Sequence, residues 1–262
     1  MGMSLPHYSI RPLVFILSLF ALGILVDFSL LPAYTQWALV LLILPTIFFL
    51  FRKHEHLDEK RLAVVIVLSI LIGVLWDKVA LHIDIWGFPD ASVSFWLLGV
   101  PIEEYIFAIA MPTIILGIYT SLPHFRKNGT LNVLRFNEKI LAVALFFVQM
   151  MVWAFLFFGD PVSYWKWLVF FAVTPSLFFL FRKGEKIDEV RLIVTLAVSL
   201  VIALTMDYFF IHSESWTYNE DALIGRLHVL PIDDILFTIF VSITIIGLYT
   251  ALPRKHILTG RW

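Results

Sequence analysis

Two short motifs set pairs of adjacent carboxyl groups at the start of apolar segments. They read PIEE at residues 101–104 and PIDD at residues 231–234, and each follows an apolar segment that contains an aspartate. An ionisable side chain at membrane depth is costly, which makes each acid a candidate for function. Adjacent carboxyls in a poorly solvated site do not readily ionise together, so a protonated acid can stand beside a carboxylate. This pattern predicts proton transfer, and the candidate catalytic residues are Glu103, Glu104, Asp77, Asp233, Asp234 and Asp207.

Other chemistries lack the residues that they need. No GxG segment and no GxxxxGK[ST] segment occurs in the chain, which argues against nicotinamide, flavin and nucleotide chemistry. The acid pairs lack the third acid of a DDxxD-like magnesium site, the eight histidines are scattered, and there is no cysteine. We therefore expect no cofactor and no metal. The chemistry that is left is proton transfer to or from an apolar substrate in the bilayer.

The composition predicts that the acids are positioned by membrane helices. Of 262 residues, 60% are hydrophobic and only 15% are charged, whereas a soluble domain has about 25% charged residues. The net charge of −1 predicts no nucleic-acid partner. A membrane span needs about 20 mostly apolar residues. Eight stretches qualify, roughly 12–31, 35–51, 62–82, 98–122, 139–158, 162–181, 192–212 and 230–252.

The chain contains an internal repeat with a constant offset of 130 residues. Residues 45–62 match residues 175–192 with 12 of 18 identities and no gap, and the same offset pairs PIEE with PIDD. We call residues 1–125 the first repeat and residues 126–262 the second repeat, each with four predicted spans. Positions related by this offset are called equivalent. An even number of spans makes the second repeat enter the membrane in the same sense as the first, so the predicted fold is an all-α membrane protein of eight helices in two parallel four-helix repeats.

The positions of lysine and arginine predict the orientation. Sixteen of the 19 lie at the N-terminus, in the links after the second, fourth and sixth stretches, and in the C-terminal tail. We therefore expect a multi-pass protein of the cell membrane with both termini cytoplasmic. The acid pairs then lie at the extracytoplasmic ends of the fourth and eighth spans.

Aromatic residues near the acids predict a binding site for an apolar molecule. The candidate substrate-binding residues are Trp76, Trp86, Phe95, Trp96, Tyr105, Phe107, Trp216 and Phe237. A simpler interpretation of PIEE exists, since proline suits the first helical position and acids in the first turn complement the helix dipole. The acid pair occurs in both repeats, each time with an aspartate on the preceding span, and this favours function.

The segment LWDKVALHIDIWGF followed by PIEEYIF, with its partial copy MDYFFIHSESW followed by PIDDILF, resembles the membrane-integral lycopene cyclases. The repeats of that family carry a Pro-x-Glu-(Glu/Asp) motif and occur as two small subunits or as one fused chain. The resemblance implies carotenoid biosynthesis, with cyclisation of the ψ ends of lycopene or a related carotenoid and no net redox change. One departure is Asp233, which stands where the family has the first Glu, matched in the first repeat by Glu103.

Carboxyl groups can supply all the steps of this reaction. Either Glu103 or Glu104 would protonate the terminal alkene, and the other, with Asp77, would stabilise the cation and accept the released proton. The expected partners are the carotenoid substrate, membrane lipid and other carotenoid-pathway enzymes. Three alternatives stay open, namely another carotenoid end-group enzyme such as a hydratase or a C50-type cyclase, a proton-coupled transporter, and a non-catalytic carotenoid- or lipid-binding subunit.

Overall fold

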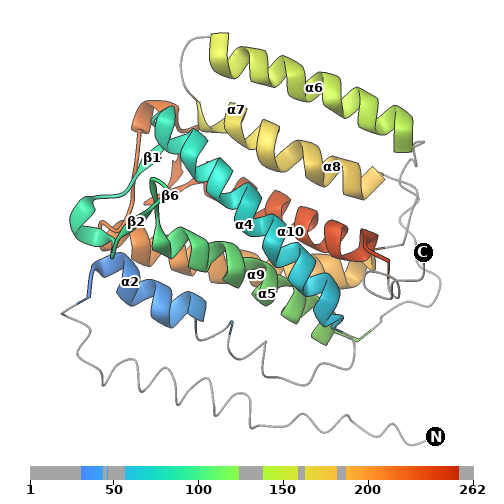
Figure 1. Ribbon diagram of the computed structural model, residues 1–262, viewed down its shortest axis with the longest axis horizontal. Coiled ribbons are helices and arrows are strands. Elements are labelled where there is room, and N and C mark those ends of the chain that lie inside the picture. The colour runs from blue at the N-terminus through green and yellow to red at the C-terminus, as the bar shows by residue number, and fades with distance from the viewer. Residues whose placement is uncertain are drawn as a thin grey trace, which may run out of the picture.

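The computed structural model describes residues 31–43, 46, 57–123, 138–158, 163–181 and 187–253. These residues form mainly helices, with short strands in the loops at one end (Figure 1). The helices are α2 (Ala33–Ala38), η2 (Leu39–Ile43), α4 (Glu59–His82), α5 (Ile102–Ser121), α6 (Glu138–Phe158), α7 (Tyr164–Leu168), η4 (Val169–Val173), α8 (Thr174–Phe181), α9 (Glu189–His212) and α10 (Ile232–Ala251).

Five helical segments are long and apolar enough to cross a membrane: α4, α5, the continuous run from α7 to α8, α9 and α10. They correspond to five of the predicted spans. The 21-residue helix α6 coincides with the predicted span 139–158. The predicted span 35–51 is described only in part, as α2, η2 and residue 46, and the predicted span 12–31 lies outside the described residues. The chain is therefore a helical membrane protein, and the full number of eight spans stays a prediction.

The helix starts follow from local sequence. The side chain of Asp58 accepts hydrogen bonds from two backbone N–H groups of α4, and Asp188 accepts one from α9, as is usual for an N-cap. Pro101 and Pro231 directly precede α5 and α10. The acid pairs consequently lie in the first turns of these two helices, where free N–H groups favour negative charge.

The segment of the second repeat that runs from α7 to α8 contains one π-helical turn, η4, directly before α8. Pro175 follows this turn and has no N–H group to donate. The backbone carbonyl of Val169 accepts from both the backbone N–H and the hydroxyl of Thr174, the latter at 2.8 Å. The first repeat has a π-helical turn, η2, at the equivalent positions. The wider turn rotates the aromatic residues of η4 relative to those of α8.

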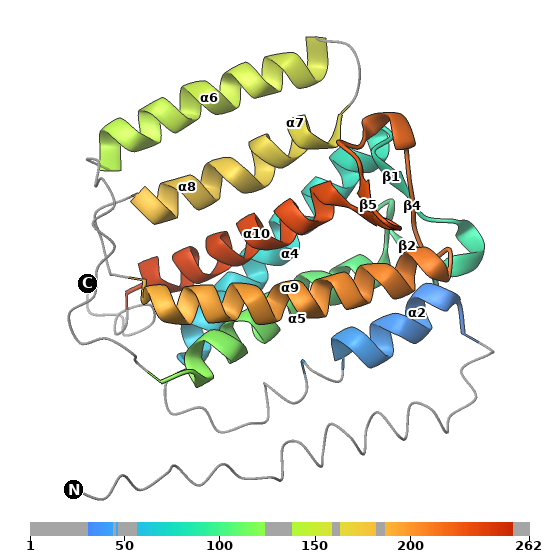
Figure 2. The ribbon, with the colours of Figure 1, turned by 180° about the vertical axis from the view of Figure 1, so that it is seen from behind.

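Helices α4, α5, α9 and α10 form the centre of the molecule, with α2 on one side and α6 on the other (Figures 1 and 2). Neighbours in sequence pack on each other, α4 on α5 and α9 on α10, and the two repeats meet where α5 packs on α9 and α10. Helix α2 packs on α5 and α9. Among the described helices, α6 packs closely on the α7–α8 segment alone.

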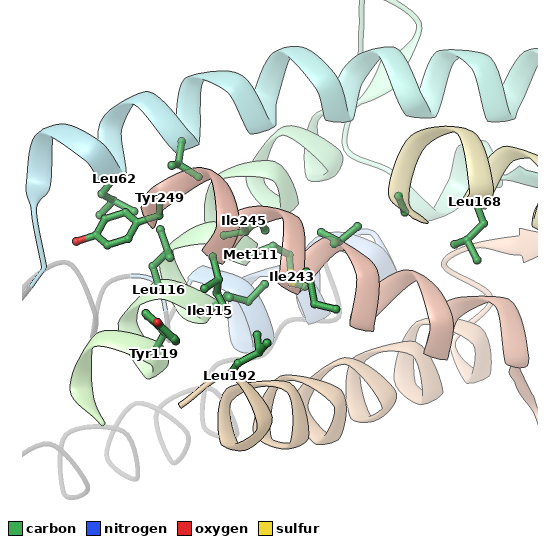
Figure 3. Packing of buried hydrophobic residues seen from close by; sticks show 14 of the residues in the cluster. Leu62, Met111, Ile115, Leu116, Tyr119, Leu168, Leu192, Ile243, Ile245 and Tyr249 are labelled. Atoms are coloured by element: carbon green, nitrogen blue, oxygen red, sulfur yellow. The ribbon is translucent and has the colours of Figure 1, made fainter. Parts of the chain in front are cut away.

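The repeats hold each other through equivalent pairs at the end opposite the acids. The guanidinium of Arg61 on α4 lies over the ring of Tyr249 on α10 at 5.6 Å. In the same way, Arg191 on α9 lies over the ring of Tyr119 on α5 at 5.7 Å. Figure 3 shows the apolar cluster between these helices, to which Leu62, Tyr119, Leu192 and Tyr249 contribute. At this end of the molecule, the start of α4 thus packs against the end of α10, and the start of α9 packs against the end of α5.

The loops at the acid end also cross between the repeats. Strand β1 (Trp86–Gly87) of the first repeat pairs antiparallel with β4 (Thr217–Tyr218) of the second. Each repeat then has a 3₁₀ turn, η3 (Asp90–Ser92) or η5 (Glu220–Ala222), and a two-stranded hairpin. The hairpins are β2 (Trp96–Leu97) with β3 (Val100–Pro101), and β5 (Arg226–Leu227) with β6 (Leu230–Pro231).

The hairpin turns have a left-handed backbone at equivalent positions. Leu98 has φ +53° in the first repeat, and its equivalent His228 has φ +61° in the second. A side chain other than glycine is rarely held in this region, so its recurrence shows that both hairpins use the same turn. In the first hairpin Gly99 follows with φ +76°, a value that glycine adopts without a Cβ penalty.

Candidate active site

One cavity of about 470 Å³ lies between the two repeats, close to the crossing loops. Its walls come from α4, α5, α9, α10 and the α7–α8 segment, and they are mostly apolar. Four carboxyl groups line it, namely Asp77 and Glu104 from the first repeat and Asp207 and Asp234 from the second. All four are buried in the protein. The structure therefore brings the acids of both repeats to a common space.

Glu104 receives a hydrogen bond from a tyrosine of α2. The phenol of Tyr34, itself fully buried, donates to Oε1 of Glu104. No partner for the second carboxyl oxygen of Glu104 occurs among the described residues. Asp77 on the neighbouring helix α4 lies close enough to Glu104 for the two charges to interact. This end of the cavity thus contains two interacting carboxyls and one phenol.

Asp234 is more completely bonded than Glu104. The phenol of Tyr164 on α7 donates to its Oδ1 at 2.8 Å, and the phenol of Tyr218 on β4 donates to its Oδ2 at 2.5 Å. Asp207 on α9 is its carboxyl neighbour, as Asp77 is that of Glu104. Both oxygens of Asp234 therefore act as acceptors, which is the arrangement that suits a carboxylate.

The first acid of each pair turns away from the cavity. Glu103 accepts from the backbone N–H of Ser94 at 2.9 Å and from the hydroxyl of Thr35 at 2.5 Å. Asp233 accepts from the backbone N–H of Ile224 at 2.9 Å. Successive helical residues point about 100° apart, so only one member of an adjacent pair can face the cavity. Glu103 and Asp233, both catalytic candidates, hold the loop before their own helix and are not among the residues that line the cavity.

Five of the eight aromatic candidates line the cavity: Trp76, Trp86, Phe107, Trp216 and Phe237. The other three do not. Phe95 and Trp96 lie in the first hairpin with exposed fractions of 54% and 41%. The phenol of Tyr105 donates to the backbone carbonyl of Leu97 at 3.0 Å, outside the cavity. None of these three residues is among those that line the cavity.

The family model described as lycopene cyclase matches residues 31–122 and 163–252, one segment in each repeat. The chain belongs to the lycopene cyclase family. Both matched segments include an acid pair and the helix that carries the accompanying aspartate.

One protein relative is distant and longer. It is the bifunctional lycopene cyclase/phytoene synthase of Aspergillus oryzae, which is 22% identical over 204 residues. The match covers 73% of this chain but only 34% of that protein's length. No solved structure matches the chain.

Sequence reasoning missed two tyrosines that donate to cavity acids, Tyr34 and Tyr164. Tyr34 and Tyr164 occupy equivalent positions in the two repeats, as do Trp37 and Trp167. The offset that pairs PIEE with PIDD would have revealed them. Tyr218 is different, because its equivalent in the first repeat is Phe88, so no comparison between the repeats would have predicted its phenol.

Trp167 is the largest fully buried side chain of the cavity wall. Its ring lies edge-on to that of Trp76 at 5.5 Å and to that of Trp86 at 4.9 Å. Since Trp76 and Trp86 belong to the first repeat and Trp167 to the second, the aromatic wall is shared. Aromatic faces carry negative charge density and stabilise a nearby cation.

The cavity is long as well as apolar. Its wall on α10 runs from Asp234 to Leu248, and this length of helix rises about 21 Å. On α4 the wall runs from Leu68 to Asp77. The acids therefore lie at one end of an elongated apolar space. Such a shape suits an extended hydrocarbon with one end at the carboxyls.

Proposed function

We propose that this protein is a lycopene cyclase of carotenoid biosynthesis, which closes the ψ ends of lycopene or a related carotenoid to rings. The observation that carries the proposal is the shared cavity, in which four carboxyls from both repeats meet at one end of an elongated apolar space with aromatic walls. Membership of the lycopene cyclase family supports the same reaction. The reaction is an isomerisation by an intramolecular lyase, and it is redox-neutral.

The proposed reaction has three steps. A protonated carboxyl transfers its proton to the terminal double bond of the ψ end, which leaves a tertiary cation. The neighbouring double bond attacks this cation, a carbon–carbon bond closes the ring, and the cation moves to a ring carbon. A carboxylate then removes a proton from an adjacent carbon and a double bond forms. One proton enters and one leaves, so atoms and charge balance.

The roles of the cavity acids follow from their surroundings. Glu104 has an oxygen without a partner among the described residues, and this oxygen can carry the proton to the substrate. Asp77 stands beside it and stabilises the cation. The rings of Trp76 and Trp167 add to this stabilisation, by roughly 0.5–2 kcal/mol each where water is excluded. Glu103 supports this end of the site by holding the loop.

The shared cavity favours cyclisation of one end at a time. A C40 carotenoid is about as long as the hydrocarbon core is thick, roughly 30 Å, and the cavity wall on α10 accounts for about 21 Å of this length. One end can therefore reach the acids while the rest lies along the cavity. The two ends would be cyclised on successive visits to the same acids.

The proposed topology has eight spans, two parallel repeats and both termini in the cytoplasm. The acid end then faces the outside of the cell membrane, and the Arg61 and Arg191 end faces the cytoplasm. A reporter fused after Trp262 should behave as cytoplasmic, and one inserted near Pro89 as external. The reverse labelling would overturn this orientation. The proposed partners are the carotenoid substrate, membrane lipid and other carotenoid-pathway enzymes.

Expression in a host that accumulates lycopene tests the function. We expect cyclic carotenoids in the pigment extract of cells with the wild-type chain and unchanged lycopene with Glu104→Gln. Glu214→Gln is the matched control, because Glu214 is exposed in a loop at the same end and should leave the pigments as in the wild type. Hydroxylated acyclic ends would indicate a hydratase instead. Unchanged lycopene with a folded, inserted wild-type protein would refute both enzymes.

Purified protein in lipid nanodiscs gives a mechanistic test. In deuterated water the exchangeable carboxyl carries deuterium, so protonation of the alkene should place one deuterium in each new ring. Mass spectrometry of the product measures this gain. A product without deuterium would contradict proton donation by an exchangeable carboxyl.

A further inference from the structure

The surroundings of Glu104 and of Asp234 differ at three equivalent positions of the outer loops. Tyr218, Arg226 and Glu220 of the second repeat stand where the first repeat has Phe88, Trp96 and Asp90. These replacements keep an acid at one position and add a phenol and a positive charge at the other two. They lie beside Asp234 only, and the reaction proposed above gives them no role.

In the second repeat the three residues form a connected network. The guanidinium of Arg226 donates to both carboxylate oxygens of Glu220, at 3.1 and 2.6 Å. It also donates to the backbone carbonyl of Val229, which fixes it against the hairpin. Its central carbon lies 5.8 Å from the centre of the Tyr218 ring. The phenol of that ring donates to Asp234, so the network ends at a cavity carboxyl.

In the first repeat the same positions form a contact without a positive charge. The indole N–H of Trp96 donates to Asp90 at 3.1 Å, and the Trp96 ring meets Phe88 edge-on at 6.4 Å. Phe88 stacks on Tyr34 at 5.7 Å, the residue that bonds Glu104. Phe88 has no phenol to offer, and Trp96 brings no positive charge. Glu104 therefore lacks both features that Asp234 has.

We propose that Arg226 is a positioning residue which, acting through Tyr218, keeps Asp234 ionised, so that protons pass from Glu104 to the substrate and from the substrate to Asp234. This inference rests on the proposed cyclase function and gives that reaction a direction. A nearby positive charge and two donated hydrogen bonds both favour the carboxylate form. Glu104, with one phenol and no cation in an equivalent place, is the better holder of a proton.

The groups around Asp234 include some that favour its ionised form and some that oppose it. Tyr164 faces it from α7 and Tyr218 from β4, and both donate. Asp207 faces it from α9 and disfavours a second negative charge, as does Asp233 on its own helix. The cavity carboxyls of the first repeat, Asp77 and Glu104, complete the charged groups that line the same cavity. Arg226 is the cation whose influence on Asp234 runs through a bonded phenol.

The network keeps its charges over a wide pH range. The hydrogen bond from Arg226 lowers the pKa of Glu220, and the hydrogen bond to Glu220 raises the pKa of Arg226. Burial raises the pKa of Tyr218, so its phenol keeps the proton that it donates. After each turnover Asp234 holds a proton and Glu104 lacks one, and the proton must return to Glu104 through water or the other cavity acids.

Two variants of Arg226 test the proposal. Arg226→Gln removes the positive charge but keeps donors, whereas Arg226→Lys keeps the charge. Cyclisation rates are measured against pH in nanodiscs, where both faces share one buffer. Without the charge Asp234 ionises at a higher pH, so the acidic limb of the profile should move up by about one pH unit, and the rate at pH values on that limb should fall roughly tenfold. Arg226→Lys should restore the wild-type profile.

A matched control and a second variant keep the test decisive. Lys78→Gln removes a positive charge from an exposed position on α4 and should leave the profile unchanged. Tyr218→Phe removes the connecting phenol and should move the acidic limb in the same direction as Arg226→Gln. A folded Arg226→Gln protein with the wild-type profile, or equal losses in the Gln and Lys variants without a pH shift, would overturn the proposal. Wild-type protein that forms no rings would instead refute the cyclase function.

Discussion

The two adjacent glutamates should respond very differently to the same substitution. Glu104→Gln replaces the carboxyl that faces the cavity with an amide of the same shape that cannot donate an acidic proton. General acid catalysis contributes about 10²–10⁴-fold to a rate, which corresponds to roughly 2.7–5.4 kcal/mol of barrier. We therefore expect Glu104→Gln to lower the cyclisation rate by at least about 100-fold, with thermal stability close to that of the wild type.

Glu103→Gln should affect stability more than chemistry. Oε1 of Glu103 accepts two hydrogen bonds, from the Ser94 N–H and the Thr35 hydroxyl, and an amide oxygen can still accept both. A hydrogen bond to a charged group contributes about 1.5–3 kcal/mol and a neutral one about 0.5–1.5 kcal/mol. The loss is therefore roughly 1 kcal/mol for each bond, or about 2 kcal/mol in total. The rate should fall by only a few-fold, through a looser loop.

The comparison needs both readouts on the same preparations. Initial rates of ring formation come from chromatography of pigments extracted from nanodiscs, and stability comes from thermal unfolding. For Glu104→Gln we expect a large loss of rate with little change in stability. For Glu103→Gln we expect a clear loss of stability with only a small loss of rate. Equal rate losses in two folded variants would show that both carboxyls take part in chemistry. Unimpaired Glu104→Gln would remove Glu104 from the proton-transfer step.

Three further predictions concern other parts of the structure. Asp234→Asn should leave lycopene unchanged, because both ends use one shared cavity; accumulation of a one-ring carotenoid in its pigment extract would indicate two independent sites. Tyr34→Phe removes the phenol that donates to Glu104 and should slow ring formation roughly tenfold, the effect of about 1.4 kcal/mol. Gly247→Ala would place a Cβ 2.3 Å from the Cβ of Phe179 and should lower the stability by about 1–3 kcal/mol in thermal unfolding. Gly73→Ala, whose Cβ would lie at an ordinary 3.4 Å from its nearest neighbour, is the control, and equal stability losses would contradict the packing of α8 on α10.

The sequence predicted five apolar helices that the structure contains, and it predicted an aspartate on the helix before each acid pair, because both depend on spacing along the chain. Apolar length marks the spans, and consecutive antiparallel helices bring Asp77 towards the start of α5. The rotation of α5 about its axis was not predictable in this way. It depends on packing against other helices, and it decides that Glu104 faces the cavity while Glu103 holds a loop.

The aromatic residues show a second limit of sequence reasoning. Trp86 and Trp96 are both near the acids along the chain, but they lie in different local structures. Trp86 belongs to β1, and Trp96 belongs to the β2–β3 hairpin. Trp86 pairs with the second repeat through β1 and β4 and reaches the cavity, whereas Trp96 lies in the exposed hairpin. Contacts between distant segments determine this difference, and neither composition nor periodicity contains them.

The shared cavity explains why the family's repeats would work as two subunits or as one fused chain. Trp86 of the first repeat packs on Tyr164 of the second at 5.4 Å, and Trp216 of the second packs on Tyr34 of the first at 5.7 Å. Each repeat therefore supplies an aromatic wall beside the tyrosine that bonds the other repeat's acid. Neither repeat alone can form the apolar surroundings that make its carboxyls useful. Fusion keeps the two repeats together in the membrane, and it also allows one of them to acquire charges, such as Arg226, that the other does without.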